Sequence, residues 1–364
     1  MKWMQILTYM PYAFFALACL VFLRPMKARI RTKAIWAMVL LACASKFVCF
    51  RELGGHPFVP RISEHLIWLW DWAYSGFIIL CGLATVLYFV RFRGKERLLP
   101  IAAWGLSAWG LWNGVSVPAV RQLELAFEDL PASLDGYRIV QLADIHCSSA
   151  ARRWRTQAIV DIVNAQKADL ICLTGDNVDG HFADSHEFIA PLADLRAKDG
   201  IYACTGNHEY YYGYWGWRNK FYDRTTNICF LCNACAFPHE GLAVAGVPDV
   251  AGIKRHLDVA PDVQAAFASA TNGEFRLLLR HQPRWADEAA REAKVDLQLS
   301  GHTHGGIAPG LNLLVARHNA GYTRGIYRHG KLTLYVNPGC GQWAGFPMRF
   351  FNPSEVTVIV LRKR

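Results

Sequence analysis

The stretch Arg138-Ile-Val-Gln-Leu-Ala-Asp-Ile-His146 places a carboxylate and an imidazole directly after a short apolar run. A run of this length predicts a buried strand. Asp144 and His146 are two residues apart, so an extended backbone lets both side chains point to one face. Four more polar clusters follow apolar runs in the same way: Gly175-Asp176, Gly206-Asn207-His208-Glu209, His281 and Gly301-His302-Thr303-His304-Gly305-Gly306.

The second part of the chain alternates between strand-like and helix-like stretches. Strands are expected at residues 138–143, 169–174, 200–205, 242–247, 274–279, 295–300, 331–336 and 355–361. Helices are expected at residues 151–166, 182–197, 215–224 and 284–293. Loops that leave the carboxyl ends of neighbouring strands in an α/β scaffold converge on one crevice. The alternation therefore predicts an α/β fold with the five polar clusters in one site.

The clusters contain oxygen and nitrogen donors in numbers that suit two metal ions. Asp176 follows a glycine, which lets the backbone turn sharply and bring the carboxylate between two ions. Asn207 offers a neutral oxygen, which limits the negative charge at the second ion. Carboxylates combined with imidazoles suit borderline divalent ions such as Mn²⁺, Fe²⁺ or Zn²⁺. The candidate ligands are Asp144, His146, Asp176, Asn207, His281, His302 and His304.

The five clusters in this order resemble the calcineurin-like metallophosphoesterases, especially their membrane-attached or exported bacterial branch. The resemblance covers residues 137–364 and includes the segment Tyr335-Val-Asn-Pro-Gly-Cys-Gly341. It implies an αββα sandwich that carries a binuclear metal centre. It also implies hydrolysis by attack of a metal-bridging hydroxide on phosphorus.

The resemblance assigns a role to each candidate residue. One ion would be held by Asp144, His146, Asp176 and His304, and the other by Asp176, Asn207, His281 and His302. Asp176 would bridge the two ions. His208 would lie outside the ligand set and provide the proton that a leaving alkoxide needs.

Aromatic residues directly follow the Asn207-His208 loop. Tyr210, Tyr211 and Trp215 are candidates to contact an acyl chain or a sugar of the substrate, or else they pack a short helix. Asp179 is either a turn residue or a residue that orients a metal ligand. Both questions stay open at the level of the sequence.

The first part of the chain contains four apolar stretches, at residues 5–23, 34–50, 66–90 and 98–120. Each is close to the roughly 20 residues that cross a hydrocarbon core as a helix. We therefore expect a four-helix transmembrane region at residues 1–121, a polar connector at 122–136 and the phosphoesterase domain at 137–364. Lys46 and Asp71 lie near the ends of their stretches, where they can snorkel to the surface or pair.

The distribution of charge assigns the basic excess to the transmembrane region. Residues 1–121 carry 14 of the 39 basic and 4 of the 29 acidic residues, a net charge of +10, whereas the remainder carries 25 of each. A neutral soluble domain gives no support for nucleic-acid binding, so no nucleic-acid partner is expected. The lipid bilayer is the expected partner.

The connections between the apolar stretches predict the orientation. The first and third connections are basic, whereas Arg51 and Arg61 in the second are balanced by Glu52 and Glu64. The positive-inside rule then places the first and third in the cytoplasm. Four spans would place the catalytic domain outside the cytoplasm, on a multi-pass protein of the inner membrane. The seven cysteines of the second part show no disulfide framework, which argues mildly against this orientation. Cys229, Cys232 and Cys235 have metal-like spacing, but a strand is favoured there.

The expected activity is hydrolysis of phosphodiester or pyrophosphate bonds, and attachment to a membrane suggests a lipid-linked or envelope substrate. Some relatives of the family cleave the pyrophosphate of UDP-2,3-diacylglucosamine in lipid A synthesis. That reaction occurs on the cytoplasmic face and would contradict the expected orientation. An alternative of another class is a noncatalytic membrane scaffold or sensor with the same fold. The complete ligand set argues against it.

Overall fold

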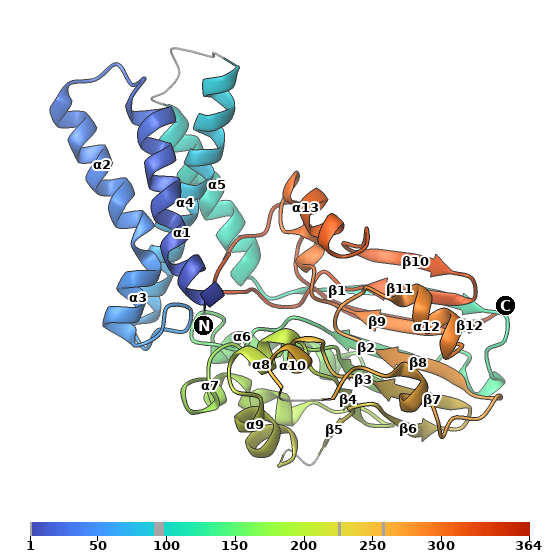
Figure 1. Ribbon diagram of the computed structural model, residues 1–364. Helices are drawn as coiled ribbons and strands as arrows, with labels where there is room; N and C mark the ends of the chain where they lie inside the picture. The colour runs from blue at the N-terminus through green and yellow to red at the C-terminus, as the bar shows by residue number, and fades with distance from the viewer. Residues whose placement is uncertain (1, 91–97, 225–226, 257–258) are drawn as a thin grey trace. The chain divides into compact units, whose positions relative to one another are not determined.

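The computed structural model describes residues 2–90, 98–224, 227–256 and 259–364. The chain forms two compact units (Figure 1). One contains residues 1–115 together with the short segment 344–348, and the other contains residues 116–343 and 349–364. Each unit is described by itself below.

The second unit is built on two six-stranded sheets, with the orders β1-β12-β2-β3-β4-β5 and β10-β11-β9-β8-β7-β6. The strands of the first sheet are β1 (Ala119–Phe127), β12 (Glu355–Lys363), β2 (Arg138–Leu142), β3 (Leu170–Leu173), β4 (Ile201–Ala203) and β5 (Ile228–Phe230). Those of the second are β10 (Gly325–His329), β11 (Leu332–Val336), β9 (Leu297–Ser300), β8 (Phe275–Leu279), β7 (Leu242–Gly246) and β6 (Ala234–His239). All eight expected strands are present.

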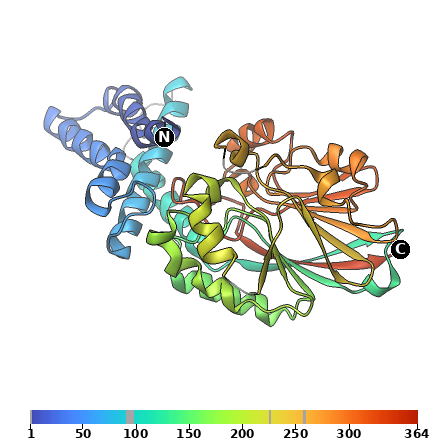
Figure 2. The same cartoon turned by 60° about the horizontal axis from the view of Figure 1, so that its bottom comes forward.

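Helices cover the outer faces of both sheets, as Figures 1 and 2 show. The first sheet carries α6 (Arg153–Ala165) and α7 (Phe182–Ile189), and the second carries α11 (Val263–Ala266) and α12 (Ala286–Glu292). The remaining helices follow strands or loops: α8 (Asn207–Tyr211), α9 (Tyr214–Trp217), α10 (Ala251–Lys254) and α13 (Leu311–His318). The expected helix at 182–197 ends as a 3-10 turn at Ala190–Asp194, where Pro191 removes a backbone donor.

The two sheets pack face to face around a shared apolar core. The side chains of β2 point alternately to the two faces of the sheet. Ile139 belongs to the apolar cluster between the sheets, whereas Val140 and Leu142 belong to the cluster under the helices. This alternation follows from the two-residue period of a strand. A buried amide crosses the core, since Gln141 Nε2 donates to the carbonyl of Ser300 on the other sheet at 3.0 Å. The four layers form the α/β sandwich that the sequence predicts.

The expected boundary between membrane region and domain differs from the structure. The fourth apolar stretch was expected to run to residue 120 and a connector to fill 122–136, but Ala119–Phe127 forms β1 and pairs in parallel with β12. Helix α5 (Leu98–Val115) ends before Pro118, which disfavours helical backbone at Val117. The stretch therefore belongs to the sheet rather than to a span or a linker.

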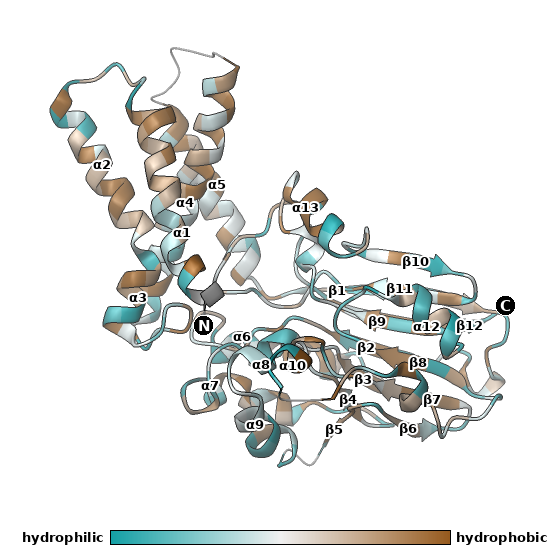
Figure 3. Ribbon diagram, viewed as in Figure 1, coloured by the Kyte–Doolittle hydropathy of each residue, from teal (hydrophilic) through white to brown (hydrophobic). Residues whose placement is uncertain are grey.

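The first unit contains the helices α1 (Lys2–Ala18), α2 (Ile30–Ala44), α3 (Lys46–Gly54), α4 (Glu64–Phe89) and α5, and a π-helical turn (Cys19–Leu23) extends α1. Figure 3 shows many hydrophobic residues, in brown, along these helices. Within the described residues, two segments are long and apolar enough to cross a membrane, Gln5–Leu23 and Glu64–Phe89. A third is obtained if α2 and α3 count as one span. The prediction of four spans is therefore corrected to two or three.

Two features explain the correction. Helices α2 and α3 are bent by 56° at Ser45, so the expected span at 34–50 is not one straight helix. Helix α5 is 18 residues long but contains Trp104, Trp109, Trp112 and Asn113, which lower its hydropathy. The third basic connection, residues 91–97, lies outside the described residues.

The two charged side chains in the apolar stretches pair with each other. Lys46 Nζ lies 2.6 Å from Asp71 Oδ1, and both side chains are buried. The same ammonium donates to the carbonyl of Ala344 at 3.1 Å. The rings of Phe47 and Tyr74 surround it within about 5 Å. Pairing, rather than an unpaired intramembrane charge, therefore accounts for both residues.

None of the eleven cysteines forms a disulfide within the chain. Cys229 and Cys235 lie on β5 and β6, and Cys232 lies in the connection between them, in agreement with the strand interpretation. Cys147 is buried in the apolar cluster beneath α6, where it fills space.

Candidate metal centre

The polar clusters lie where the parallel strands of both sheets end. Strands β2, β3 and β4 are parallel neighbours in the first sheet, and β8 and β9 are parallel neighbours in the second. Each candidate ligand follows the carboxyl end of one of these strands by two to four residues. The edges of both sheets therefore meet at one group of buried or half-buried polar side chains.

One group brings together donors from both sheets: Asp144, His146 and His304. His146 Nε2 lies 3.1 Å from His304 Nε2. His304 Nε2 is 3.7 Å from Asp144 Oδ1. The backbone amide of His302 donates to both carboxylate oxygens of Asp144, at 3.0 and 2.9 Å, and thereby ties the two loops together.

A second group contains Asp176, His281 and His302. His281 Nε2 lies 3.2 Å from Asp176 Oδ2 and 3.2 Å from Asn207 Oδ1. His302 Nδ1 is also 3.2 Å from the same nitrogen of His281. The carbonyl of Thr174 lies 2.9 Å from His281 Nδ1 and orients the ring so that Nε2 faces the group. The structure thus brings together all seven predicted ligands, while their division between two ions stays a prediction.

Five of the candidate ligands have backbone conformations that are rare for residues with a side chain. Their φ angles are positive: Asp144 51°, His146 52°, Asp176 52°, His302 74° and His304 47°. Such conformations cost free energy and persist where the surrounding structure requires them, often at functional sites. The sharp turns direct the side chains inward directly after the strands.

Two glycines of the sequence clusters leave room for carboxylates. A Cβ at Gly206 would collide with Asp176 Oδ1, and a Cβ at Gly301 would collide with Asp144 Oδ2. The clusters therefore need glycine because the backbone passes against the carboxylates.

The donor set fits a pair of divalent cations. Nitrogen and oxygen lone pairs of His146, His304, His281 and Asn207 face one another at 3.1–3.2 Å. Atoms that only accept are expected to repel at this distance unless a proton or a cation lies between them. Imidazole, carboxylate and one amide oxygen together match borderline metals such as Mn²⁺, Fe²⁺ and Zn²⁺.

The electrostatic environment keeps two of the imidazoles neutral. Burial, together with the neighbouring His281, lowers the pKa of His302 to about 3. Burial, with His146 and Arg349 nearby, lowers the pKa of His304 well below its ordinary value. Neutral imidazole is the form that binds a metal ion. Burial opposes a proton on His281 too, but Asp176 outweighs it and raises the pKa of that ring, so a cation would compete with this proton.

His208 lies beside the ligands and shares a carboxylate with one of them. Asp179 Oδ1 accepts a short hydrogen bond from His208 Nδ1 and lies 3.2 Å from His146 Nδ1. This contact leaves Nε2 of each ring pointing toward the centre. Burial alone would lower the pKa of His208, but Asp176 and Asp179 outweigh it and raise the pKa to about 9. The ring is therefore protonated at neutral pH and can donate a proton.

Glu209 holds the backbone of two loops and was assigned no role from the sequence. Its carboxylate accepts from the amides of Asp176 at 3.1 Å, Asn177 at 2.8 Å and Gly206 at 2.8 Å. It is completely buried. Its place in the Gly-Asn-His-Glu cluster was the available signal, because a buried carboxylate needs several donors.

Arg349 and Trp343 also approach the centre, and no pattern in the sequence marked them. Arg349 is buried, donates to the carbonyl of Pro338 at 2.8 Å and lies 3.4 Å from His304 Nδ1. The rings of Trp343 and His208 are 6.1 Å apart. Both residues lie in the loop between β11 and β12, which only the tertiary structure brings to the ligands.

The three candidate substrate contacts have different environments. Tyr210 is 1% exposed, so it packs inside the domain instead of facing a substrate. Its hydroxyl is 3.0 Å from Thr205 Oγ1, and its ring stacks on that of Tyr214. Tyr211 is half-buried, with its ring 5.4 Å from that of His208. Trp215 is 55% exposed.

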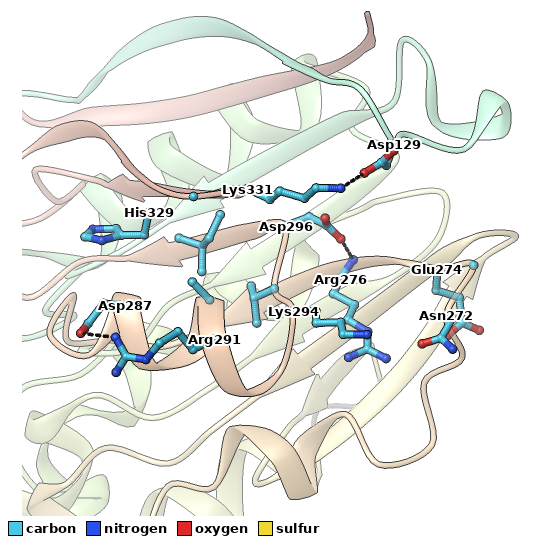
Figure 4. Close-up of a pocket in the computed structure, with 15 residues that line it drawn as sticks. Asp129, Asn272, Glu274, Arg276, Asp287, Arg291, Lys294, Asp296, His329 and Lys331 are labelled. Carbon is cyan, nitrogen blue, oxygen red and sulfur yellow. Dashed lines mark hydrogen bonds and ion pairs between the residues drawn. The ribbon is translucent and has the colours of Figure 1, made fainter.

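A cleft of about 910 Å³ opens at the other end of the second sheet, before the strands β8, β9 and β11 begin. We call it the distal cleft; Figure 4 shows its charged lining, which includes Asp129, Glu274, Asp287, Asp296 and Lys331. Its acidic side chains are engaged within the chain: Asp129 with Lys331 at 2.5 Å, Asp287 with Arg291 at 3.1 Å, and Asp296 and Glu274 with backbone amides. None of the candidate ligands lines it.

Comparisons with known proteins agree with this geometry. The family model of calcineurin-like phosphoesterases matches residues 137–306. An uncharacterized metallophosphoesterase of Helicobacter pylori is 30% identical over 337 residues, which cover 90% of this chain and 89% of that protein. A transmembrane protein with metallophosphoesterase domain from Danio rerio is 34% identical over 266 residues, which cover 71% of this chain and 60% of that protein.

Proposed function

This chain belongs to the calcineurin-like phosphoesterase family, and from that membership we propose that it is a membrane-anchored hydrolase that uses two divalent metal ions to cleave phosphodiester or pyrophosphate bonds. The observation that carries the proposal is the meeting of the Asp144-His146-His304 and Asp176-His281-His302 groups at the ends of two sheets. Asn207 completes the second group.

The chemistry of phosphoryl transfer explains why such a donor set is needed. When bound, two divalent ions lower the pKa of water and neutralise the phosphoryl oxygens of an anionic substrate. Asp176 lies in the second group and beside His208: its Oδ2 is 3.2 Å from His281 Nε2, and its Oδ1 accepts from the amide of His208 at 2.8 Å. Its pKa is held well below the ordinary value because His281 and His208 outweigh the effect of burial. It therefore stays ionised as the shared carboxylate.

His208 is the proposed proton donor to the leaving group. Asp179 accepts at Nδ1, so the proton at Nε2 faces the centre. A leaving alkoxide must gain a proton or a positive field, and a protonated imidazole supplies both. His208 Nε2 is 3.9 Å from Asp176 Oδ2, which places the donor directly beside the shared carboxylate.

The substrate class that we propose is a lipid-linked or envelope phosphoester or anhydride. Support comes from the apolar helices of the first unit, two of which are long and apolar enough to anchor the hydrolase in a membrane. Half-buried Tyr211, whose ring is 5.4 Å from that of His208, and exposed Trp215 are the proposed substrate contacts. No contact in the structure singles out a UDP-diacylglucosamine headgroup. A noncatalytic scaffold would not need the protonated His208 and its Asp179 partner.

The side of the membrane depends on helix α5. The basic first connection favours a cytoplasmic position for that loop. We propose an inner-membrane protein whose domain lies outside the cytoplasm, as two crossings, or four with α5, would require; three crossings would place the domain inside. A C-terminal alkaline phosphatase or green fluorescent protein fusion distinguishes the two, because the first is active only outside and the second fluoresces inside.

The activity is tested with the purified full chain in detergent. After metal removal with EDTA, Mn²⁺, Fe²⁺ or Zn²⁺ is added back, and hydrolysis of bis-(p-nitrophenyl) phosphate and of a lipid pyrophosphate is measured. We expect metal-dependent hydrolysis that His281→Ala abolishes and that His186→Ala, a change at an exposed histidine, leaves intact. Equal activity with and without metal, or in the two variants, would contradict the proposal.

A further inference from the structure

The loop that carries His304 continues into a helix whose apolar side chains are exposed. Helix α13 is eight residues long and contains no buried residue. Leu311 is 38% exposed, Leu313 70% and Leu314 57%. Isolated helices of this length are marginal in water, and most helices of proteins are stabilised by packing of an apolar face. The leucines of α13 lack that packing within the described part of the chain.

The geometry of α13 directs these leucines away from the domain. Asn312 packs against Gly306, where an added Cβ would lie 2.5 Å from Asn312 Cβ. With 3.6 residues per turn, Leu313 and Leu314 then lie on the side of the helix that faces away from Gly306. Arg317 falls between them on the same side and is exposed. Figure 3 shows the brown apolar residues of α13 in an otherwise more polar region of the domain.

The stretch of sequence that contains α13 has basic but no acidic residues. No Asp or Glu occurs between Asp296 and Glu355, whereas Arg317 lies on α13 and Arg324 follows it closely in the chain. The phosphoesterase part as a whole is neutral, so the acid-free region is a local feature. Leucines interleaved with basic residues are typical of helices that lie in the interface of a bilayer with anionic lipids.

We propose that α13 is an interfacial helix that docks on the lipid bilayer to which the first unit is anchored. Leu313 and Leu314 would enter the boundary of the acyl chains, while Arg317 binds anionic headgroups. A single short helix binds lipid weakly, but the membrane anchor supplies a high local concentration of bilayer, so weak binding is sufficient. Because α13 follows the His304 loop directly, docking would hold the metal centre next to lipid headgroups.

Photocrosslinking of the full chain tests the proposal. The photoreactive amino acid p-benzoylphenylalanine replaces Leu313, and the protein is reconstituted in vesicles of phosphatidylethanolamine and alkyne-labelled phosphatidylglycerol. The control places the same residue at Phe237, which is 48% exposed on β6. We expect lipid capture at position 313 to exceed that at 237 by about fivefold or more, and to fall when Arg317→Gln is added.

Equal lipid capture at positions 313 and 237 would overturn the proposal. Crosslinks from position 313 to a second copy of the chain, or to the helices of the first unit, would overturn it as well, because α13 would then be covered by protein. Crosslinking requires no catalysis, so the result is independent of the proposed hydrolysis. Retained metal content in the Leu313 variant serves as the control for folding.

Discussion

Charged side chains lie at both ends of the sheet sandwich, but they differ in burial and in pairing. At the metal-centre end, carboxylates and imidazoles are buried or half-buried, and five candidate ligands have positive φ angles. At the distal cleft, the charges of Asp129 and Asp287 are exposed and already paired with Lys331 and Arg291. The distal cleft has a volume of about 910 Å³ but is lined by none of the candidate ligands. Function is therefore indicated by strained donors that lie together at the strand ends rather than by the size of a cleft.

This difference has a physical basis. A buried acceptor that faces another acceptor costs free energy unless a cation or proton compensates it. An exposed ion pair contributes little to the free energy of folding, because water screens its charges. Substitutions at the two ends should therefore differ strongly in their effects, and the predictions below are ordered from the largest expected effect to the smallest.

Asp176→Ala should have the largest effect. It removes the carboxylate that we propose the two metal ions share, and loss of metal-based charge stabilisation is expected to lower kcat/KM for bis-(p-nitrophenyl) phosphate by about 10³-fold or more. The matched change at the other end, Asp287→Ala, should leave kcat/KM unchanged. Similar losses in both variants would remove the distinction between the two ends.

His208→Gln should lower kcat by about 10²- to 10⁴-fold for a substrate with an alkoxide leaving group while the protein keeps its metal. The loss should be smaller for bis-(p-nitrophenyl) phosphate, because p-nitrophenolate leaves without a proton. The measurement is kcat for both substrates together with the metal content. An equal loss for both leaving groups would show that His208 is not the proton donor.

Asp179→Asn should lower metal affinity by about 10- to 100-fold, because the carboxylate orients His146. It should also change the pH profile. A proton donor works below its pKa, so activity should fall as the pH rises through the pKa of His208, about 9. Without the charge of Asp179 this pKa is lower, so the alkaline decline should move to lower pH. If the alkaline decline of kcat stays at the same pH in Asp179→Asn, a group other than His208 causes that decline.

Lys331→Ala, in the distal cleft, should have the smallest effect. It breaks the ion pair with Asp129, and both side chains are largely exposed. We expect unchanged kcat and an unchanged melting temperature, because such pairs are screened by solvent. A clear loss of activity would assign the distal cleft a role in the reaction.

The sequence predicts an α/β fold because short apolar runs alternate with helix-like stretches and five of the runs end in a polar cluster, and the family resemblance implies the sheet sandwich. It predicts the donors of the metal centre because Asp144 and His146 are two residues apart at a strand end, where both side chains can point to one face. Gly206 and Gly301 begin two further polar clusters. The positions of Arg349 and Trp343 near the metal centre could not be predicted, because no pattern around these two residues in the loop between β11 and β12 indicates that they lie near His208 or His304. Strand β1 was missed because its apolar residues continue those of α5, so hydropathy alone extends the span across Pro118.

The number of membrane spans also could not be predicted from hydropathy alone. A count of apolar residues does not detect the bend at Ser45, and it treats the tryptophans of α5 as equal to leucines. The pairing of Lys46 with Asp71 depends on packing between helices that are distant in sequence. Such features follow from tertiary contacts rather than from composition.

The most direct measurement is the number of metal ions bound per chain. The purified full chain is stripped with EDTA, loaded with Mn²⁺, dialysed and analysed by inductively coupled plasma mass spectrometry, beside Asp176→Ala and Asp287→Ala. We predict two ions per chain in the wild-type protein and in Asp287→Ala, and fewer than one in Asp176→Ala. Two ions retained by Asp176→Ala, or none bound by the wild-type protein, would contradict the two-metal centre.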